Sequence, residues 1–248
     1  MPVILIFIIT FIIILITAYY IYAKSKARFG DKKSIEKYLS KFNDITITKL
    51  DKDNLVYKGP NTKAAFIFYP GGFIEQYAYE PLMAALAHRG IMCIIHKSSP
   101  IPPFLAYNYS DGIKDKFPEI KNWYIGGHSL GGVCSSYYAS KHLNDFKGLV
   151  LLGAYTILNL VHSKLKVLSI YGSEDKVLNM KKYKQYKPSL PKDLVEFIIE
   201  GGCHSYFGMY GIQSGDGNPK ISNEEQIEIT VDKISQWINS LWLNNNMK

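Results

Sequence analysis

The chain has 248 residues, of which 47% are hydrophobic and 20% are charged, and its formal net charge is +8. This length and composition allow a sizeable buried core and exclude a disordered chain. The three cysteines are an odd number without metal-ligand spacing, so they exclude a disulfide framework, and we expect neither a metal nor a cofactor.

The first predicted element is a membrane anchor over residues 1–23. Residues 2–23 carry no charged side chain, and as a helix they extend about 33 Å, enough for a hydrocarbon core of about 30 Å. A cleaved signal peptide would start with basic residues and have a shorter apolar core, whereas a buried core helix would have a polar face. The end of the segment holds three tyrosines and then three basic residues: Tyr19, Tyr20, Tyr22, Lys24, Lys26 and Arg28.

Residues 24–43 are predicted to form a basic juxtamembrane segment. By the positive-inside rule, its charges place the rest of this single-pass chain on the cytoplasmic side. Lys32, Lys33 and Lys37 either touch anionic lipid or form a solvated helix face. Beyond the anchor the positive charge is mild, so nucleic acid is not an expected partner.

Residues 44–248 are predicted to form one α/β domain. The expected strands are 45–50 and 54–59, joined as a hairpin, and then 64–69, 91–96, 123–126, 148–152, 167–171 and 195–199. The expected helices are 79–89, 104–116, 133–142 and 223–243. This alternation predicts a mostly parallel, doubly wound sheet with helices on both faces. Ligands of such sheets bind beyond the carboxyl ends of the strands, so candidate site residues should directly follow strands.

A candidate nucleophile lies in the sequence GHSLG at residues 127–131, which matches the pattern G-x-S-x-G. The pattern follows an apolar strand and opens a helix, as a nucleophile elbow requires, and the glycines leave room for its tight turn. The alternative is a plain glycine-rich turn between a strand and a helix. A serine hydroxyl is a weak nucleophile, so Ser129 would need a base.

His204 is the candidate base, because it follows the last expected strand in a loop that begins with two glycines. Such a base needs a carboxylate to orient it. Asp175 follows the strand 167–171 and is the first choice, with its neighbour Glu174 as the alternative. The resulting order of serine, aspartate and histidine along the chain is that of the nucleophile-elbow hydrolases.

The developing oxyanion needs N–H donors that are already in place. One predicted donor is the N–H group of Leu130, directly after the serine. The other should come from the loop YPGGF at residues 69–73, where Gly72 is the first choice and Phe73 the next. Pro70 is excluded because proline has no N–H group.

At these residues the sequence resembles the α/β-hydrolases, and within that superfamily the small lidless group related to dienelactone hydrolases. The matching stretches are YPGGF (69–73), YIGGHSLGG (124–132), YGSED (171–175) and GGCHSYFGMYG (201–211). The resemblance implies a triad of Ser129, His204 and Asp175. Dienelactone hydrolases proper use a cysteine nucleophile, so the serine found here favours an esterase.

The loop after His204 leaves two interpretations open. Its apolar residues Tyr206, Phe207, Met209 and Tyr210 either line an acyl pocket or pack as loop anchors. Asp216, between two glycines, is expected as a turn residue rather than a buried hydrogen-bond acceptor.

The sequence therefore predicts a membrane-anchored carboxylesterase that cleaves small or medium acyl esters with a Ser–His–Asp triad. The expected partners are a small-molecule ester or acyl substrate and the membrane. Two alternatives stay open. One is an acyltransferase that uses the same triad, and the other is a non-catalytic, membrane-tethered binding protein on a hydrolase fold.

Overall fold

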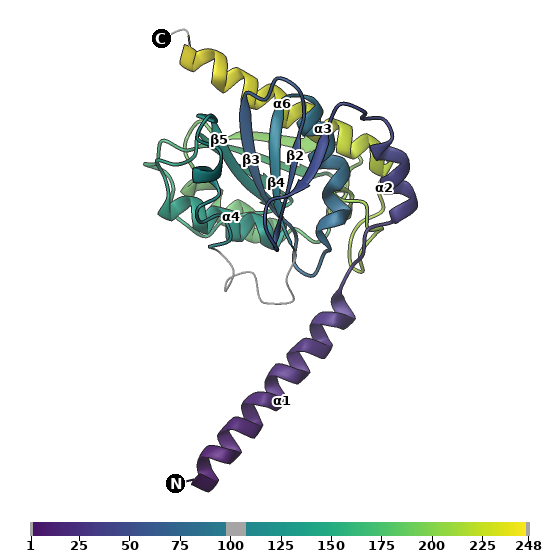
Figure 1. Cartoon of the computed structure of the whole chain (residues 1–248), viewed down its shortest axis with the longest axis vertical. Coiled ribbons are helices and arrows are strands. Elements are labelled where there is room, and N and C mark those ends of the chain that lie inside the picture. The colour runs from purple at the N-terminus through teal and green to yellow at the C-terminus, as the bar shows by residue number, and fades with distance from the viewer. Residues whose placement is uncertain (1, 98–107, 247–248) are drawn as a thin grey trace.

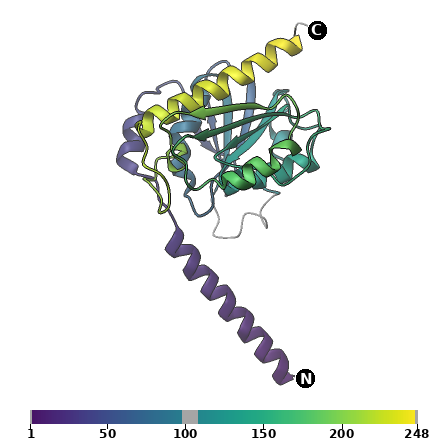
Figure 2. The ribbon, with the colours of Figure 1, turned by 180° about the vertical axis from the view of Figure 1, so that it is seen from behind.

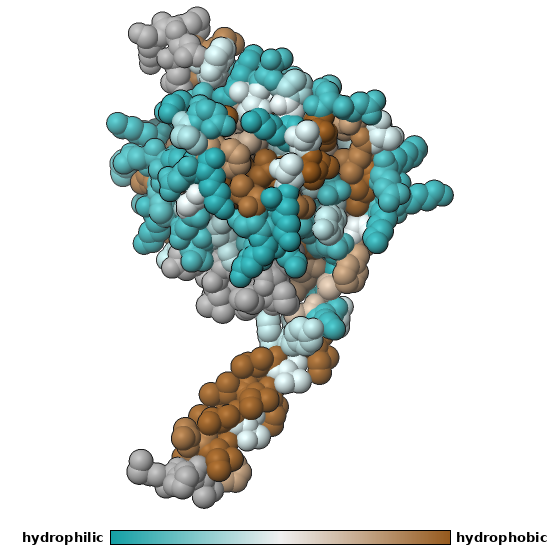
Figure 3. Space-filling view, in the orientation of Figure 1, coloured by the Kyte–Doolittle hydropathy of each residue, from teal (hydrophilic) through white to brown (hydrophobic). Residues whose placement is uncertain are grey.

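The computed structural model describes residues 2–97 and 108–246. Helix α1 (Pro2–Lys26) projects by itself from one side of a rounded domain, and the C-terminus lies on the opposite side (Figure 1). Its stretch Ile4–Lys26 is long and apolar enough to cross a membrane and is the one such helix among the described residues. Figure 3 shows α1 as an apolar rod below a domain whose visible face is largely hydrophilic.

In the described part of the chain, the domain is built on one sheet of eight strands in the order β1-β2-β4-β3-β5-β6-β7-β8. The strands are β1 (Thr46–Lys49), β2 (Asn54–Lys58), β3 (Ala64–Tyr69), β4 (Ile91–His96), β5 (Trp123–His128), β6 (Gly148–Leu152), β7 (Lys166–Gly172) and β8 (Val195–Ile199). Strands β1 and β2 pair antiparallel with each other, and β2 pairs antiparallel with β4, whereas all other pairs are parallel. The predicted mostly parallel sheet is confirmed.

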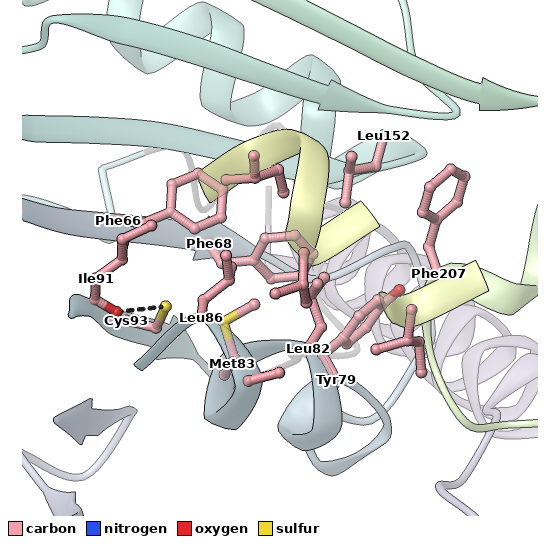
Figure 4. Close-up of a cluster of buried hydrophobic side chains, with 14 of the residues drawn as sticks. Phe66, Phe68, Tyr79, Leu82, Met83, Leu86, Ile91, Cys93, Leu152 and Phe207 are labelled. Carbon is pink, nitrogen blue, oxygen red and sulfur yellow. Dashed lines mark hydrogen bonds between the residues drawn. The ribbon is translucent and has the colours of Figure 1, made fainter. Parts of the chain in front are cut away.

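Helices cover both faces of this sheet, as predicted. One face carries α2 (Lys32–Leu39), α3 (Glu80–His88) and α6 (Asn223–Asn246), and the other carries α4 (Leu130–Lys141) and α5 (Met180–Tyr186). Figure 2, the view from behind, shows α6 lying across the sheet. Because side chains alternate along a strand, β3 contributes side chains to the core on both faces of the sheet. Phe66 and Phe68 pack towards α3 (Figure 4), whereas Ala65 and Ile67 belong to the layer of α4.

The prediction of a helix over residues 104–116 is wrong for the part of this range that the structure describes, residues 108–116. Residues 108–116 form turns that end in a short 3-10 helix, η3 (Lys114–Lys116), and residues 104–107 lie outside the described residues. Gly112 has φ +70°, a left-handed conformation that interrupts a helix. The described residues also form the 3-10 helices η1 (Gln76–Tyr79), η4 (Lys187–Ser189) and η5 (Ser205–Phe207).

Helix α2 lies in the juxtamembrane segment and packs on the domain. Its side chains Ile35 and Tyr38 are buried in the core, and the Tyr38 hydroxyl donates a hydrogen bond to Glu228 of α6. An ion pair between Lys41 and Glu224 adds a second contact with α6, at 2.9 Å. The chain therefore joins the folded body well before β1.

All three cysteines are unpaired and buried. Burial raises the pKa of the Cys134 and Cys203 thiols to about 12, and it raises that of Cys93 well above its ordinary value. Thiols in such surroundings stay protonated at neutral pH and behave as small apolar groups.

Candidate active site

The turn between β5 and α4 forces Ser129 into an unusual backbone conformation. Its φ and ψ are 53° and −124°, and the residue is half-buried. A Cβ atom on Gly131 would lie 2.1 Å from the carbonyl oxygen of Tyr69, and one on Gly127 would lie 2.5 Å from the carbonyl carbon of Gly131. Only glycine fits at either position. The left-handed backbone of Ser129 costs about 1–3 kcal/mol of folding free energy, which the surrounding packing must offset.

His204 and Asp175 form a buried pair. The His204 Nδ1 atom lies 2.8 Å from Asp175 Oδ2, and the two side chains are 2% and 0% exposed. The other carboxylate oxygen of Asp175 accepts hydrogen bonds from the N–H groups of Val177 and Leu178, at 2.9 and 2.8 Å. The carboxylate is thus fixed by the backbone on one side and holds the histidine ring on the other.

The neighbouring Glu174 points elsewhere. Its carboxylate pairs with Lys220 at 2.7 Å, and the hydrogen bond from Lys220 lowers the pKa of Glu174. Of the two acidic residues that the sequence left open, the structure brings Asp175 to His204.

The second ring nitrogen of His204 has no hydrogen-bond partner among the described residues. Nε2 is buried and makes no hydrogen bond within the described parts of the chain. Because Nδ1–H donates to Asp175, Nε2 carries a lone pair and can accept a proton. The ring lies against that of His128, with the centroids 4.5 Å apart, and His128 directly precedes Ser129. The candidate base therefore lies beside the elbow that carries the serine.

The loop after β3 lies against the start of α4. A Cβ atom on Gly72 would lie 3.1 Å from Cδ2 of Leu130, so the two predicted oxyanion donors are close together. As far as the structure describes the chain, the N–H groups of Gly72, Phe73 and Leu130 make no hydrogen bond. For Leu130 this follows from its place in the first turn of α4, where N–H groups have no partner within the helix. Within the described residues, none of the three groups is therefore used for an internal hydrogen bond.

Tyr79 and His128 support this loop, and sequence reasoning had not singled them out. The Gly71 N–H group donates to the Tyr79 hydroxyl at 3.0 Å, and that hydroxyl lies 2.8 Å from Nδ1 of His128. The hydroxyl therefore donates its own proton to Nδ1. Burial lowers the pKa of His128 well below its ordinary value, so the ring stays neutral. The resulting chain of hydrogen bonds joins the loop after β3 to the elbow.

Asp216 orders the loop of His204, so its predicted role as a turn residue is incomplete. One of its oxygens accepts from the His204 N–H group at 3.2 Å, and the other accepts from the N–H and hydroxyl groups of Ser205, at 2.7 and 2.6 Å. Burial by itself would raise the pKa of Asp216, but these hydrogen bonds outweigh it and lower the pKa. A charged carboxylate thus fixes the backbone of the candidate base.

Two of the apolar residues in this loop are packed anchors. Phe207 and Met209 are buried in the core layer of α3 and α6, where Figure 4 shows Phe207 near Tyr79. Cys203 is also fully buried, which agrees with a packing role. Within the described ranges, no group of three or more His, Cys, Asp or Glu side chains is placed to hold a metal ion.

Comparison with known proteins gives the family. A sequence profile described as the alpha/beta hydrolase family matches residues 65–228, which is more than half of the chain. The chain belongs to this family. The matched region includes every candidate site residue named above.

Individual relatives are distant. An uncharacterized protein of Corynebacterium glutamicum is 22% identical over 157 residues, and the match covers 58% of this chain but only 35% of that protein. Est1E from Butyrivibrio proteoclasticus is 12% identical with a TM-score of 0.58, covering 81% of this chain and 100% of its own. A thermostable esterase from Pseudomonas putida is 11% identical with a TM-score of 0.60, covering 85% and 88%. At these identities the two solved structures establish the shared fold alone.

Proposed function

We propose that the protein is a membrane-anchored serine hydrolase that cleaves carboxylic esters with small or medium acyl groups. The observation that carries the proposal is the buried His204–Asp175 pair, whose free Nε2 lies beside the strained elbow of Ser129. A buried, oriented imidazole beside a half-buried serine hydroxyl is the arrangement that acyl transfer needs.

In the proposed mechanism, the Ser129 hydroxyl oxygen attacks the carbonyl carbon of the ester while His204 Nε2 takes its proton. Asp175 keeps the ring oriented and stabilises its charged form. The N–H groups of Leu130 and Gly72, with Phe73 as the alternative second donor, bind the oxyanion. His204 then protonates the departing alcohol. In the second half of the cycle, His204 removes a proton from water, which attacks the acyl carbon. The bond from this carbon to the Ser129 oxygen then breaks, His204 returns the proton to that oxygen, and the acid is released.

We also propose that α1 is the anchor and that the domain lies on the cytoplasmic side, because Lys24, Lys26 and Arg28 follow the apolar stretch. We propose the same division into an anchor (1–23), a juxtamembrane segment (24–43) and a hydrolase domain (44–248), with one difference in how the segments relate. Helix α2 of the juxtamembrane segment packs on the domain.

The test is hydrolysis of a p-nitrophenyl ester series by the full chain in detergent, with labelling by a fluorophosphonate probe. Ser129→Ala should abolish labelling, and both Ser129→Ala and Asp175→Ala should lower turnover by about 10³-fold or more. Glu174→Ala is the matched control and should stay close to wild type, because its carboxylate faces Lys220.

An intact fold without turnover or labelling would contradict the proposal and favour a tethered binding protein. Added alcohols that raise turnover and divert the product to a new ester would instead indicate an acyltransferase.

A further inference from the structure

The end of α1 is attached to the very loop that carries the candidate oxyanion donors. Arg28 pairs with Ile74 as a short parallel bridge. In this bridge the Arg28 N–H group donates to the Phe73 carbonyl oxygen at 2.8 Å, and the Glu75 N–H group donates to the Arg28 carbonyl oxygen at 2.9 Å. Only Ala27 separates α1 from this bridge, so the helix is joined to the domain by a short, fixed connection rather than by a free linker.

Side chains at the end of α1 extend this attachment. The Tyr22 ring packs edge-on against Phe73, with the ring centroids 6.0 Å apart. Ala23 is buried, although the neighbouring residues of the helix are exposed. A little further on, the Asp31 N–H group donates to the Met209 carbonyl oxygen at 2.8 Å, which joins the same stretch to the loop after His204. Both loops that frame the site are thus held by the segment that leaves the anchor.

The path from the anchor to the candidate nucleophile is short. Tyr22 contacts Phe73, Phe73 follows Gly72, and Gly72 lies against Leu130, the residue after Ser129. Tyrosines at the end of an apolar span lie at the level of the lipid headgroups. If α1 spans a bilayer, the mouth of the site lies close to that level.

The surface around this junction suits an interface between water and lipid. A hollow of about 430 Å³ lies between the end of α1 and the β1–β2 hairpin, and Phe73 lines it. Several large apolar side chains are exposed on the segments that meet here: Phe29 (69%), Tyr77 (46%), Leu130 (38%) and Ile212 (50%). Charged residues of both signs line the same hollow, and basic groups are in excess: Lys24, Arg28, Lys49, Lys52 and Lys97 against Asp51, Asp53 and Glu75. A basic excess is expected beside anionic headgroups.

We infer that the docked anchor turns the active-site edge of the domain towards the bilayer, so that the natural substrate is an ester dissolved in the membrane. This inference rests on the proposed function and names its substrate class: an amphiphilic lipid ester whose acyl chain stays in the bilayer while its carbonyl group reaches the site. Water-soluble esters remain substrates, because the catalytic groups do not depend on the orientation.

The experiment uses the full chain in phosphatidylcholine proteoliposomes and two esters with one leaving group. 4-Methylumbelliferyl decanoate, a medium-chain ester dissolved in the bilayer, reports membrane-presented substrate, and 4-methylumbelliferyl acetate in water reports the chemistry itself. A flexible Gly-Ser linker of about twelve residues, spanning about 20 Å, is inserted between Lys26 and Ala27. It frees the domain from α1 but leaves the Arg28–Ile74 bridge in place.

We expect the linker to lower the ratio of decanoate to acetate turnover by about tenfold, because the domain loses its fixed position at the bilayer. Phe29→Ser should lower the ratio in the same direction. The matched control is Leu243→Ser, which removes another exposed side chain, 50% exposed, near the end of α6 on the opposite side of the domain.

An unchanged ratio in the linker variant, with acetate turnover intact, overturns the inference and leaves the proposed function standing. If the wild type does not hydrolyse the acetate ester, or if Ser129→Ala still hydrolyses it, the proposed function itself is refuted. The two failures are therefore distinguishable.

Discussion

Gly153 contributes no side chain to the candidate site, and that lack of a side chain leaves room for the His204–Asp175 pair. The residue follows β6 with φ +52°. A Cβ atom there would lie 2.9 Å from Nδ1 of His204 and 3.2 Å from Oδ2 of Asp175. The hydrogen bond between these two side chains therefore depends on glycine at this position.

Gly153→Ala should lower ester turnover by about tenfold or more, because a methyl group would push the imidazole away from the carboxylate and misplace the base. The added left-handed strain should also cost about 1–2 kcal/mol of stability. The measurements are kcat on a soluble ester and the free energy of unfolding.

Gly112→Ala separates the two effects. Gly112 has φ +70°, and among the described residues a Cβ atom there would meet nothing within 4 Å. This variant should lose a similar amount of stability but keep its kcat. Equal losses of activity in both variants would contradict the role of Gly153.

The sequence identified the candidate triad because each member directly follows a strand, in an order that only some hydrolases share. Gly153 also follows a strand, but a lone glycine carries no chemical signal, and its contact with His204 exists only in space. For the same reason, the position of Asp216 between two glycines could not distinguish a turn residue from the acceptor that holds the His204 backbone.

At the scale of elements, the parallel strands were predicted well because long apolar runs indicate burial on both faces. Helices α2 and α5 were not predicted. Their sequences KKSIEKYL and MKKYKQY are short and mostly polar, and each buries only one or two side chains. Such helices owe their stability to tertiary contacts, like that between Tyr38 and Glu228, rather than to a local pattern.

The Tyr79 hydroxyl links three elements: the loop after β3, the helix η1 and the end of β5. Tyr79→Phe would leave the buried Gly71 N–H group and Nδ1 of His128 without a partner, which costs about 1–3 kcal/mol of stability. We also expect a several-fold lower kcat, because the loop that offers the Gly72 N–H group would lose its support.

Tyr57→Phe provides the matched control, since its buried hydroxyl donates to Glu80 at 2.8 Å, outside the site. The control should lose stability without a change in kcat. A Tyr79→Phe variant that is destabilised but fully active would show that this hydrogen-bond chain serves the fold alone.

At the scale of the whole molecule, stability should depend on pH through two buried neutral histidines. Burial lowers the pKa of His96 to about 4, against the opposing effect of Asp53 and Asp51, and lowers that of His128 well below its ordinary value. Unfolding returns both to about 6.5. Below that pH the unfolded chain binds more protons than the folded chain, so stability is present above pH 6.5 and is lost as the pH falls.

For His96 the loss should reach about 2 kcal/mol at pH 5. The measurement is the free energy of unfolding at pH 7.5 and pH 5 in the wild type and in His96→Gln, which removes the titrating group. The variant should lose less stability than the wild type between the two pH values. Parallel losses would mean that His96 is not held neutral in the folded protein.

The burial of Cys93, Cys134 and Cys203 makes the natural chain nearly silent towards thiol reagents. None of the three needs to be replaced before a reporter cysteine is introduced, and Leu243→Cys would supply an accessible one on α6. In intact cells a membrane-impermeant maleimide would then label a domain that faces outwards at once, and a cytoplasmic domain only after permeabilisation. The same chemistry could carry a fluorophore to the far end of the molecule, from which the height of the domain above a bilayer can be measured.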